Sequence, residues 1–206
     1  MARWTILAVV ACLLFAPLAR ADGDPASDYL LGTTAFVPPD AGVPAADAAQ
    51  LRAVLAAAKT RGYEIRVALI ATRYDMGSVA SLFRRPLDYT RFLGQELFFV
   101  YKGRLLVVMP NGYGVSRGGK PLPAAQRLVD RLPPPGTNGH ALATGATSAV
   151  RKLAAASGVH VPLIQPAAKK SSGHWFVIGI IALIVIFGAG TSVIVWTYRG
   201  RLSTLR

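Results

Sequence analysis

The segment NGYGVSRGGK, residues 111–120, contains the residue types that an anion-binding loop needs. Five of its ten residues are glycine or asparagine, which tolerate a positive φ. Successive backbone N–H groups in such a segment can form a concave nest for an anion, beside the cations Arg117 and Lys120. The predicted anion-binding residues are Asn111, Gly112, Tyr113, Gly114, Arg117 and Lys120. The alternative is a hairpin exit in which the glycines serve only sharp bends.

Three carboxylates suggest a second site. Asp75, Asp88 and Glu96 flank the helices expected in the middle of the chain and could meet as oxygen ligands of a divalent cation such as calcium. The simpler interpretation is that they are helix caps and surface charges. Asp88, for example, falls in the first turn of a predicted helix, where the helix dipole favours a negative charge. We predict no cofactor, with this cation site as the alternative.

Groups suited to hydrolysis are scarce. Cleavage of a phosphate ester needs a metal clamp or a nucleophile with an adjacent base. His140, His160 and His174 fall in a loop, a linker and a membrane flank, so none is placed as a general base. We therefore predict no catalytic residue and a protein that is not an enzyme; the alternative is a phosphatase-like hydrolase of phosphorylated envelope substrates.

The first 21 residues have the pattern of a signal peptide. Arg3 precedes an apolar run, which closes on the small-x-small sequence of residues 19–21. The single cysteine, Cys12, lies in this run, so cleavage after residue 21 would leave no thiol and no disulfide. An uncleaved anchor and a lipidated Cys12 are the alternatives.

The C-terminal part predicts a membrane anchor. Residues 176–195 carry no charge and are long enough to cross a bilayer as a helix, so we predict a transmembrane helix over 175–198 and a cytoplasmic tail over 199–206. Gly188 and Ser192 form a small-xxx-small pair through which two copies could form a homodimer. The expected location is the cell membrane, with a single pass and the N-terminal domain outside the cytoplasm.

Proline content and periodicity divide the middle of the chain. Residues 22–43 are rich in proline and predict an extended arm, 44–158 form one domain, and 159–174 are a linker. Helices are predicted from Pro44 to Gly62, in two pieces over 76–95, and over 123–132 and 138–156; strands are predicted over 64–71, 97–101 and 104–109. The last two strands should form a hairpin through Lys102 and Gly103. The predicted fold is a small layered α/β domain.

The exposed part of the chain is basic. Of the 23 Lys and Arg residues, eighteen fall within residues 22–173, against all ten Asp and Glu, which gives about +8. Such a domain is attracted to anionic surfaces. The cations do not alternate with stacking aromatic residues, so nucleic acid is not expected as a partner.

Three features of the sequence carry a resemblance. They are the segment LLVVMPNGYGV at 105–115, the segment DAGV at 40–43, and Gly139, Ala141, Leu142 and Gly145 in the last helix. In this order they are similar to the TPM domain family over residues 36–156. The resemblance implies an α/β domain that serves membrane-protein complexes, with phosphatase activity and divalent metal binding in some members. Family members often carry an acidic residue just after the Gly-Tyr-Gly segment, where this chain has Val115 and Ser116.

These observations together predict a function in binding. We expect a membrane-tethered, extracytoplasmic accessory domain that assists or scaffolds an envelope membrane-protein complex, with the bilayer and an anionic surface as further partners.

Overall fold

The computed structural model describes residues 23–163. The predicted signal peptide, the transmembrane helix with its Gly188–Ser192 pair, and the cytoplasmic tail lie outside these residues. Among the described residues, none of the helices combines the length and apolarity that a membrane crossing requires.

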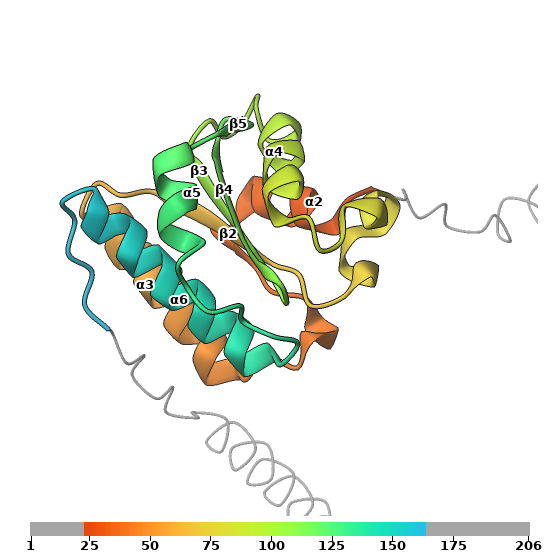
Figure 1. Cartoon of the computed structure of the whole chain (residues 1–206), viewed down its shortest axis with the longest axis horizontal. Helices are drawn as coiled ribbons and strands as arrows, with labels where there is room; N and C mark the ends of the chain where they lie inside the picture. The colour runs from red at the N-terminus through yellow and green to blue at the C-terminus, as the bar shows by residue number, and fades with distance from the viewer. Residues whose placement is uncertain (1–22, 164–206) are drawn as a thin grey trace, which may run out of the picture. The chain divides into compact units, whose positions relative to one another are not determined.

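The described chain forms a five-stranded sheet between two layers of helices (Figure 1). The strands, in spatial and chain order, are β1 (Ala35–Phe36), β2 (Ile65–Leu69), β3 (Arg104–Met109), β4 (Gly112–Arg117) and β5 (Lys120–Pro121). The first three are parallel to one another, and β4 and β5 are antiparallel to their neighbours. The predicted α/β class is therefore confirmed for the described domain.

One face of the sheet packs against α3 (Ala45–Thr60), α5 (Pro123–Val129) and α6 (Gly139–Ala156). The side chains that β3 directs to this face are Leu106 and Val108, both fully buried. α3 contributes a buried stripe at helical spacing, made of Leu51, Val54, Leu55 and Ala58. The predicted helices over these three segments are confirmed.

The other face packs against α2 (Pro25–Gly32), the 3-10 segment η2 (Arg73–Leu82) and α4 (Pro86–Glu96). Here β3 contributes Leu105, Val107 and Met109, so both faces of this strand are buried. Such burial explains its continuous apolar sequence. The division of the predicted helical region 76–95 at Pro86 is confirmed.

The predicted extended arm over 22–43 is wrong. Its prolines begin helices instead of interrupting them: Pro25 starts α2, and Pro39 starts the short 3-10 helix η1 (Pro39–Ala41). The Asp24 side chain caps α2 by accepting a hydrogen bond from the Ser27 backbone N–H. Because Leu30 is fully buried, the domain begins about twenty residues earlier than predicted.

The predicted hairpin over 97–101 and 104–109 is also wrong. Residues 97–100 form a turn in which the Tyr101 N–H donates to the Leu97 carbonyl at 2.7 Å. The hairpin partner of β3 is β4, which follows Pro110 and Asn111. The predicted linker from 159 also begins later, because Val161 is buried and its carbonyl accepts from Arg151 Nε at 2.9 Å.

Candidate binding site at the basic end of the sheet

The segment predicted as an anion-binding loop is mostly a strand. Residues 112–117 pair along their full length with β3, so this stretch is extended and its N–H groups point alternately to opposite edges of the strand instead of converging on one point. On its other edge, Val115 N–H donates to Gln126 Oε1, and Gln126 Nε2 donates to the Tyr113 carbonyl, each at 2.9 Å. The predicted nest over this stretch is therefore wrong.

Four of the predicted anion-binding residues have structural roles. Asn111 Nδ2 donates to the Arg84 carbonyl at 2.7 Å, and the Tyr113 hydroxyl donates to the Pro133 carbonyl at 3.2 Å. Burial raises the pKa of Tyr113. Gly112 has φ 149°, a conformation that favours glycine, and a Cβ at Gly114 would lie 2.0 Å from the carbonyl oxygen at the start of α4.

The two cations of the predicted site lie at the opposite end of β4, about 17 Å from Gly112 at 3.4 Å per strand residue. Arg117 lies directly opposite Arg104 on β3 and directly opposite Lys120 on β5. Directly opposite residues project from the same face of a sheet, so the three cations form a row across three strands. We call Arg104, Arg117 and Lys120 the basic row.

A tight turn fixes this arrangement. Gly118 and Gly119 have φ 53° and 74°, the pair of positive values that a two-residue hairpin turn requires. Like charges placed directly opposite each other destabilise a sheet. Within residues 23–163 the ion pairs join other groups, so no carboxylate neutralises the basic row. A bound anion would remove this repulsion.

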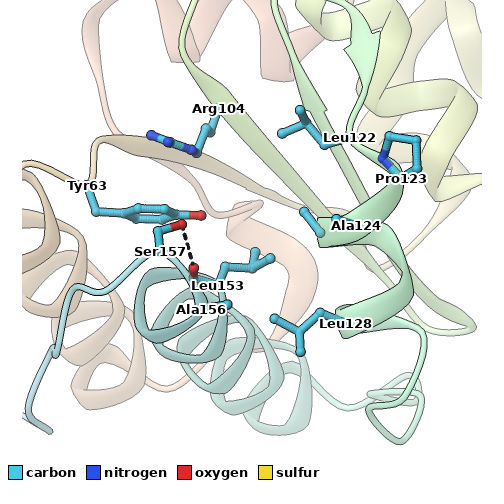
Figure 2. Close-up of a pocket in the computed structure, with 10 residues that line it drawn as sticks. Tyr63, Arg104, Leu122, Pro123, Ala124, Leu128, Leu153, Ala156 and Ser157 are labelled. Carbon is cyan, nitrogen blue, oxygen red and sulfur yellow. Dashed lines mark hydrogen bonds between the residues drawn. The ribbon is translucent and has the colours of Figure 1, made fainter.

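An apolar pocket adjoins the basic row (Figure 2). It has a volume of about 380 Å³ and lies between α5 and the C-terminal end of α6, with Arg104 and Tyr63 at one side and Leu122, Leu128 and Leu153 among its lining residues. The Arg104 guanidinium lies over the Tyr63 ring, 4.5 Å from its centre. Burial raises the pKa of Tyr63 and the positive charge of Arg104 opposes that shift.

This geometry suits a ligand with two parts. An anionic group can contact the basic row while an apolar group fills the pocket. Two of the lining residues, Tyr63 and Ser157, carry a hydroxyl, and Ser157 Oγ donates to the Leu153 carbonyl at 3.2 Å (Figure 2). No histidine or carboxylate lines the pocket beside it to serve as its base.

The structure does not bring the three predicted cation ligands together. Asp75 Oδ2 accepts from the backbone N–H groups of Ala71 and Thr72, each at 2.8 Å, as part of a capping box. Asp88 Oδ2 accepts from Arg85 Nε at 2.9 Å, and Glu96 is exposed at the end of α4. No three His, Cys, Asp or Glu side chains among the described residues converge as metal ligands.

The histidines have different environments. His140 Nδ1 lies 2.6 Å from Asp47 Oδ2, so this pair joins the first turns of α6 and α3. Its two members are 93 residues apart, and no local pattern could have revealed the pair. His160 is exposed, and His174 lies outside the described residues.

Sequence reasoning missed Arg104 and the pocket. The basic row depends on strand register, and local sequence identifies Arg104 only as the first residue of a strand. The one available signal was the dipeptide Gly118–Gly119 between two cations, which is typical of a two-residue hairpin turn.

Residues that carry the TPM resemblance contact one another. A Cβ at Gly139 would lie 2.3 Å from the Ala41 carbonyl oxygen, and one at Gly145 would lie 2.8 Å from the Tyr113 hydroxyl. These residues are therefore needed for close packing, which is compatible with many functions. The TPM resemblance stays a prediction, since the chain matches no protein-family model and no curated protein or solved structure is significantly similar to it.

Proposed function

We propose that this protein is a membrane-tethered, extracytoplasmic binding domain that assists or scaffolds an envelope membrane-protein complex. The observation that carries this proposal is the basic row beside the apolar pocket. A segment of a partner protein with a carboxylate next to a large apolar side chain would satisfy both parts of the site.

Charge and shape support a binding role. The row of Arg104, Arg117 and Lys120 attracts acidic groups over several ångströms, whereas the pocket adds specificity through apolar burial. This proposal includes membership of the TPM family. The resemblance to that family implies a role in assisting membrane-protein complexes.

A site-specific crosslinking experiment tests the proposal. A photoreactive amino acid replaces Leu122, which lines the pocket and is only partly buried. The full chain is expressed in its own membranes, irradiated and purified, and crosslinked partners are identified. The second sample adds Arg117→Glu with Lys120→Glu, and we expect the captured partner to be lost.

The matched control reverses a charge elsewhere. Arg52 is exposed on α3 and belongs to no ion pair among the described residues, so Arg52→Glu should leave capture unchanged. Capture that survives the double reversal, or that is lost equally in the Arg52 variant, would contradict a binding role for the basic row.

A further inference from the structure

A turn next to the basic row exposes three consecutive apolar side chains. Phe98 is 41% exposed, Phe99 93% and Val100 62%, whereas Leu97 and Tyr101 on either side are buried. The Tyr101 N–H bonds to the Leu97 carbonyl and the Val100 N–H to the same carbonyl, which closes the turn. Folding therefore fixes a protruding apolar tip that contributes little to the core. We call residues 98–100 the aromatic tip.

Three cations lie near the aromatic tip. Lys102 Nζ lies 4.5 Å from the centre of the Phe98 ring. The Gly118 N–H donates to the Gly103 carbonyl at 3.3 Å, which holds the β4–β5 turn, and with it Arg117 and Lys120, beside this segment. In Figure 1 both turns lie at the top of the view, near β5 and the end of α4.

Nearby carboxylates cancel this charge only in part. Glu96 is the acidic residue next to the tip in sequence, and Glu64, just before β2, is paired with Lys59 at 3.0 Å. Lys102, Arg117 and Lys120 are exposed, and none is in an ion pair among the described residues. The tip therefore combines exposed apolar groups with a net positive border.

We infer that the aromatic tip docks the domain on the surface of an anionic phospholipid bilayer. Phe98, Phe99 and Val100 enter the region between headgroups and acyl chains, while Lys102, Arg117 and Lys120 contact headgroup phosphates. Aromatic side chains favour this interfacial region, and juxtaposed cations add attraction to anionic lipids.

The shape of the tip favours a bilayer over a protein partner. Protein interfaces bury broad patches contributed by several segments, whereas here one turn projects three adjacent side chains. The predicted anchor at 175–198 also places a bilayer within reach. Residues 164–174, eleven in all, can span at most about 40 Å from Leu163 at 3.6 Å per residue. The inference rests on the membrane anchor of the proposed function and shares Arg117 and Lys120 with the proposed partner site, but it does not require the accessory role.

The chain contains a matched control position. Tyr74 is 86% exposed and aromatic, but it follows β2, whereas the aromatic tip precedes β3. Because β2 and β3 are parallel, these two positions lie at opposite ends of the sheet. A probe at Tyr74 therefore reports nonspecific contact with lipid.

A fluorescence experiment on the full chain in lipid nanodiscs tests the inference. Cys12 is the sole cysteine, so Cys12→Ser with Phe99→Cys gives one thiol, which is labelled with an environment-sensitive fluorophore. Nanodiscs of phosphatidylcholine are compared with nanodiscs that also contain phosphatidylglycerol. In the anionic nanodiscs we expect a blue-shifted emission and a several-fold greater quenching by spin-labelled lipid than for Tyr74→Cys.

Added salt, or Lys102→Gln with Lys120→Gln, should reduce this difference, because the attraction to headgroups is screened or removed. A probe at position 99 that remains as exposed as the one at position 74 in both lipids would overturn the inference. Equal protection in both lipids would also overturn it, as would protection that requires added membrane proteins. Failure to capture a partner from position 122 would contradict only the accessory function. Phe99→Ser should weaken the contact with lipid but leave that capture unchanged when the protein is irradiated in detergent.

Discussion

The Tyr89 hydroxyl donates a hydrogen bond of 2.5 Å to Asp24 Oδ1, and both side chains are buried. Asp24 caps α2, and Tyr89 lies in the first turn of α4, so the bond joins two helices that cover the same face of the sheet. Burial raises the pKa of Asp24 to about 6, and the hydrogen bond from Tyr89 opposes this shift.

This carboxyl group makes stability depend on pH. The pKa of Asp24 is about 6 when folded and takes its ordinary value of 3.8 when unfolded. Between these values the folded state retains a proton that the unfolded chain releases, so the stabilisation present below pH 3.8 is lost as the pH rises through 6. The gap of about two units corresponds to roughly 3 kcal/mol at 1.36 kcal/mol per unit.

Asp24→Asn should remove this dependence. Its side-chain oxygen can still accept from the Ser27 N–H, and its Nδ2 can donate to the Tyr89 hydroxyl oxygen, but the buried charge is absent. Above pH 6 we expect its free energy of unfolding to exceed that of the wild type by on the order of 2–3 kcal/mol, with little difference near pH 4. Denaturant unfolding of the domain of residues 23–163 from pH 4 to 8 measures this, and parallel pH profiles for the two proteins would contradict it.

A second prediction concerns the contact between α4 and β4. A Cβ at Gly114 would lie 2.0 Å from the Pro86 carbonyl oxygen and 2.4 Å from Thr90 Oγ1. Gly114→Ala should therefore destabilise the domain by about 1–3 kcal/mol, because the helix must move away from the sheet. Gly32→Ala is the control: a Cβ there meets no atom within 4 Å. Similar unfolding midpoints for the two variants would show that α4 is not held this closely.

Much of the fold was predictable from periodicity. Leu51, Val54 and Leu55 occur at helical spacing, and Pro86 marks the start of a helix because its fixed φ suits the first turn. The turn at residues 97–100 was not predictable from the local sequence. The composition of residues 97–101 is that of a buried strand, yet the side chains of Phe98, Phe99 and Val100 face solvent. Local propensity cannot distinguish a core strand from an apolar tip.

The site was predictable only in part. Arg117 and Lys120 stood out as cations beside glycines, and their position at the Gly118–Gly119 turn follows from local sequence. Arg104 became part of the site through the register of β3 with β4, and Tyr63 through the packing that places its ring under Arg104. Both relationships are tertiary, so no local pattern contains them.

A third prediction concerns hydrolysis. Asp75 caps η2 and Asp88 is paired with Arg85, so neither carboxylate is free to bind a metal without losing its present contacts. The domain of residues 23–163 should therefore show no turnover of a generic phosphomonoester with magnesium, manganese or calcium. Metal-dependent turnover that Asp88→Asn abolishes would instead favour the phosphatase-like alternative.

A fourth prediction concerns topology. The mature chain should begin near residue 22, with Gly118 outside the membrane and Arg206 inside. N-terminal sequencing checks the cleavage, and protease treatment of intact cells checks the orientation of an epitope tag placed at each position. Cleavage of the tag at Arg206 from the outside would reject the predicted membrane topology.

The last prediction concerns the basic row. Arg117 lies between Arg104 and Lys120, so Arg117→Gln removes both cross-strand repulsions. Each such contact is worth about 0.2–1 kcal/mol, and we expect the variant to melt at a higher temperature than the wild type at low ionic strength. The difference should shrink as chloride is added, because these exposed charges are screened over about 8–10 Å.

Phosphate distinguishes specific binding from screening. At equal ionic strength, phosphate should raise the wild-type melting temperature more than chloride does, since a ligand that binds only the folded state stabilises it. Arg117→Gln should lose this extra increment, whereas Arg52→Gln, which removes an exposed charge on α3, should keep it. If the increment is the same in all three proteins, phosphate acts through general salt effects, and the basic row is a feature of strand register without an anion-binding role.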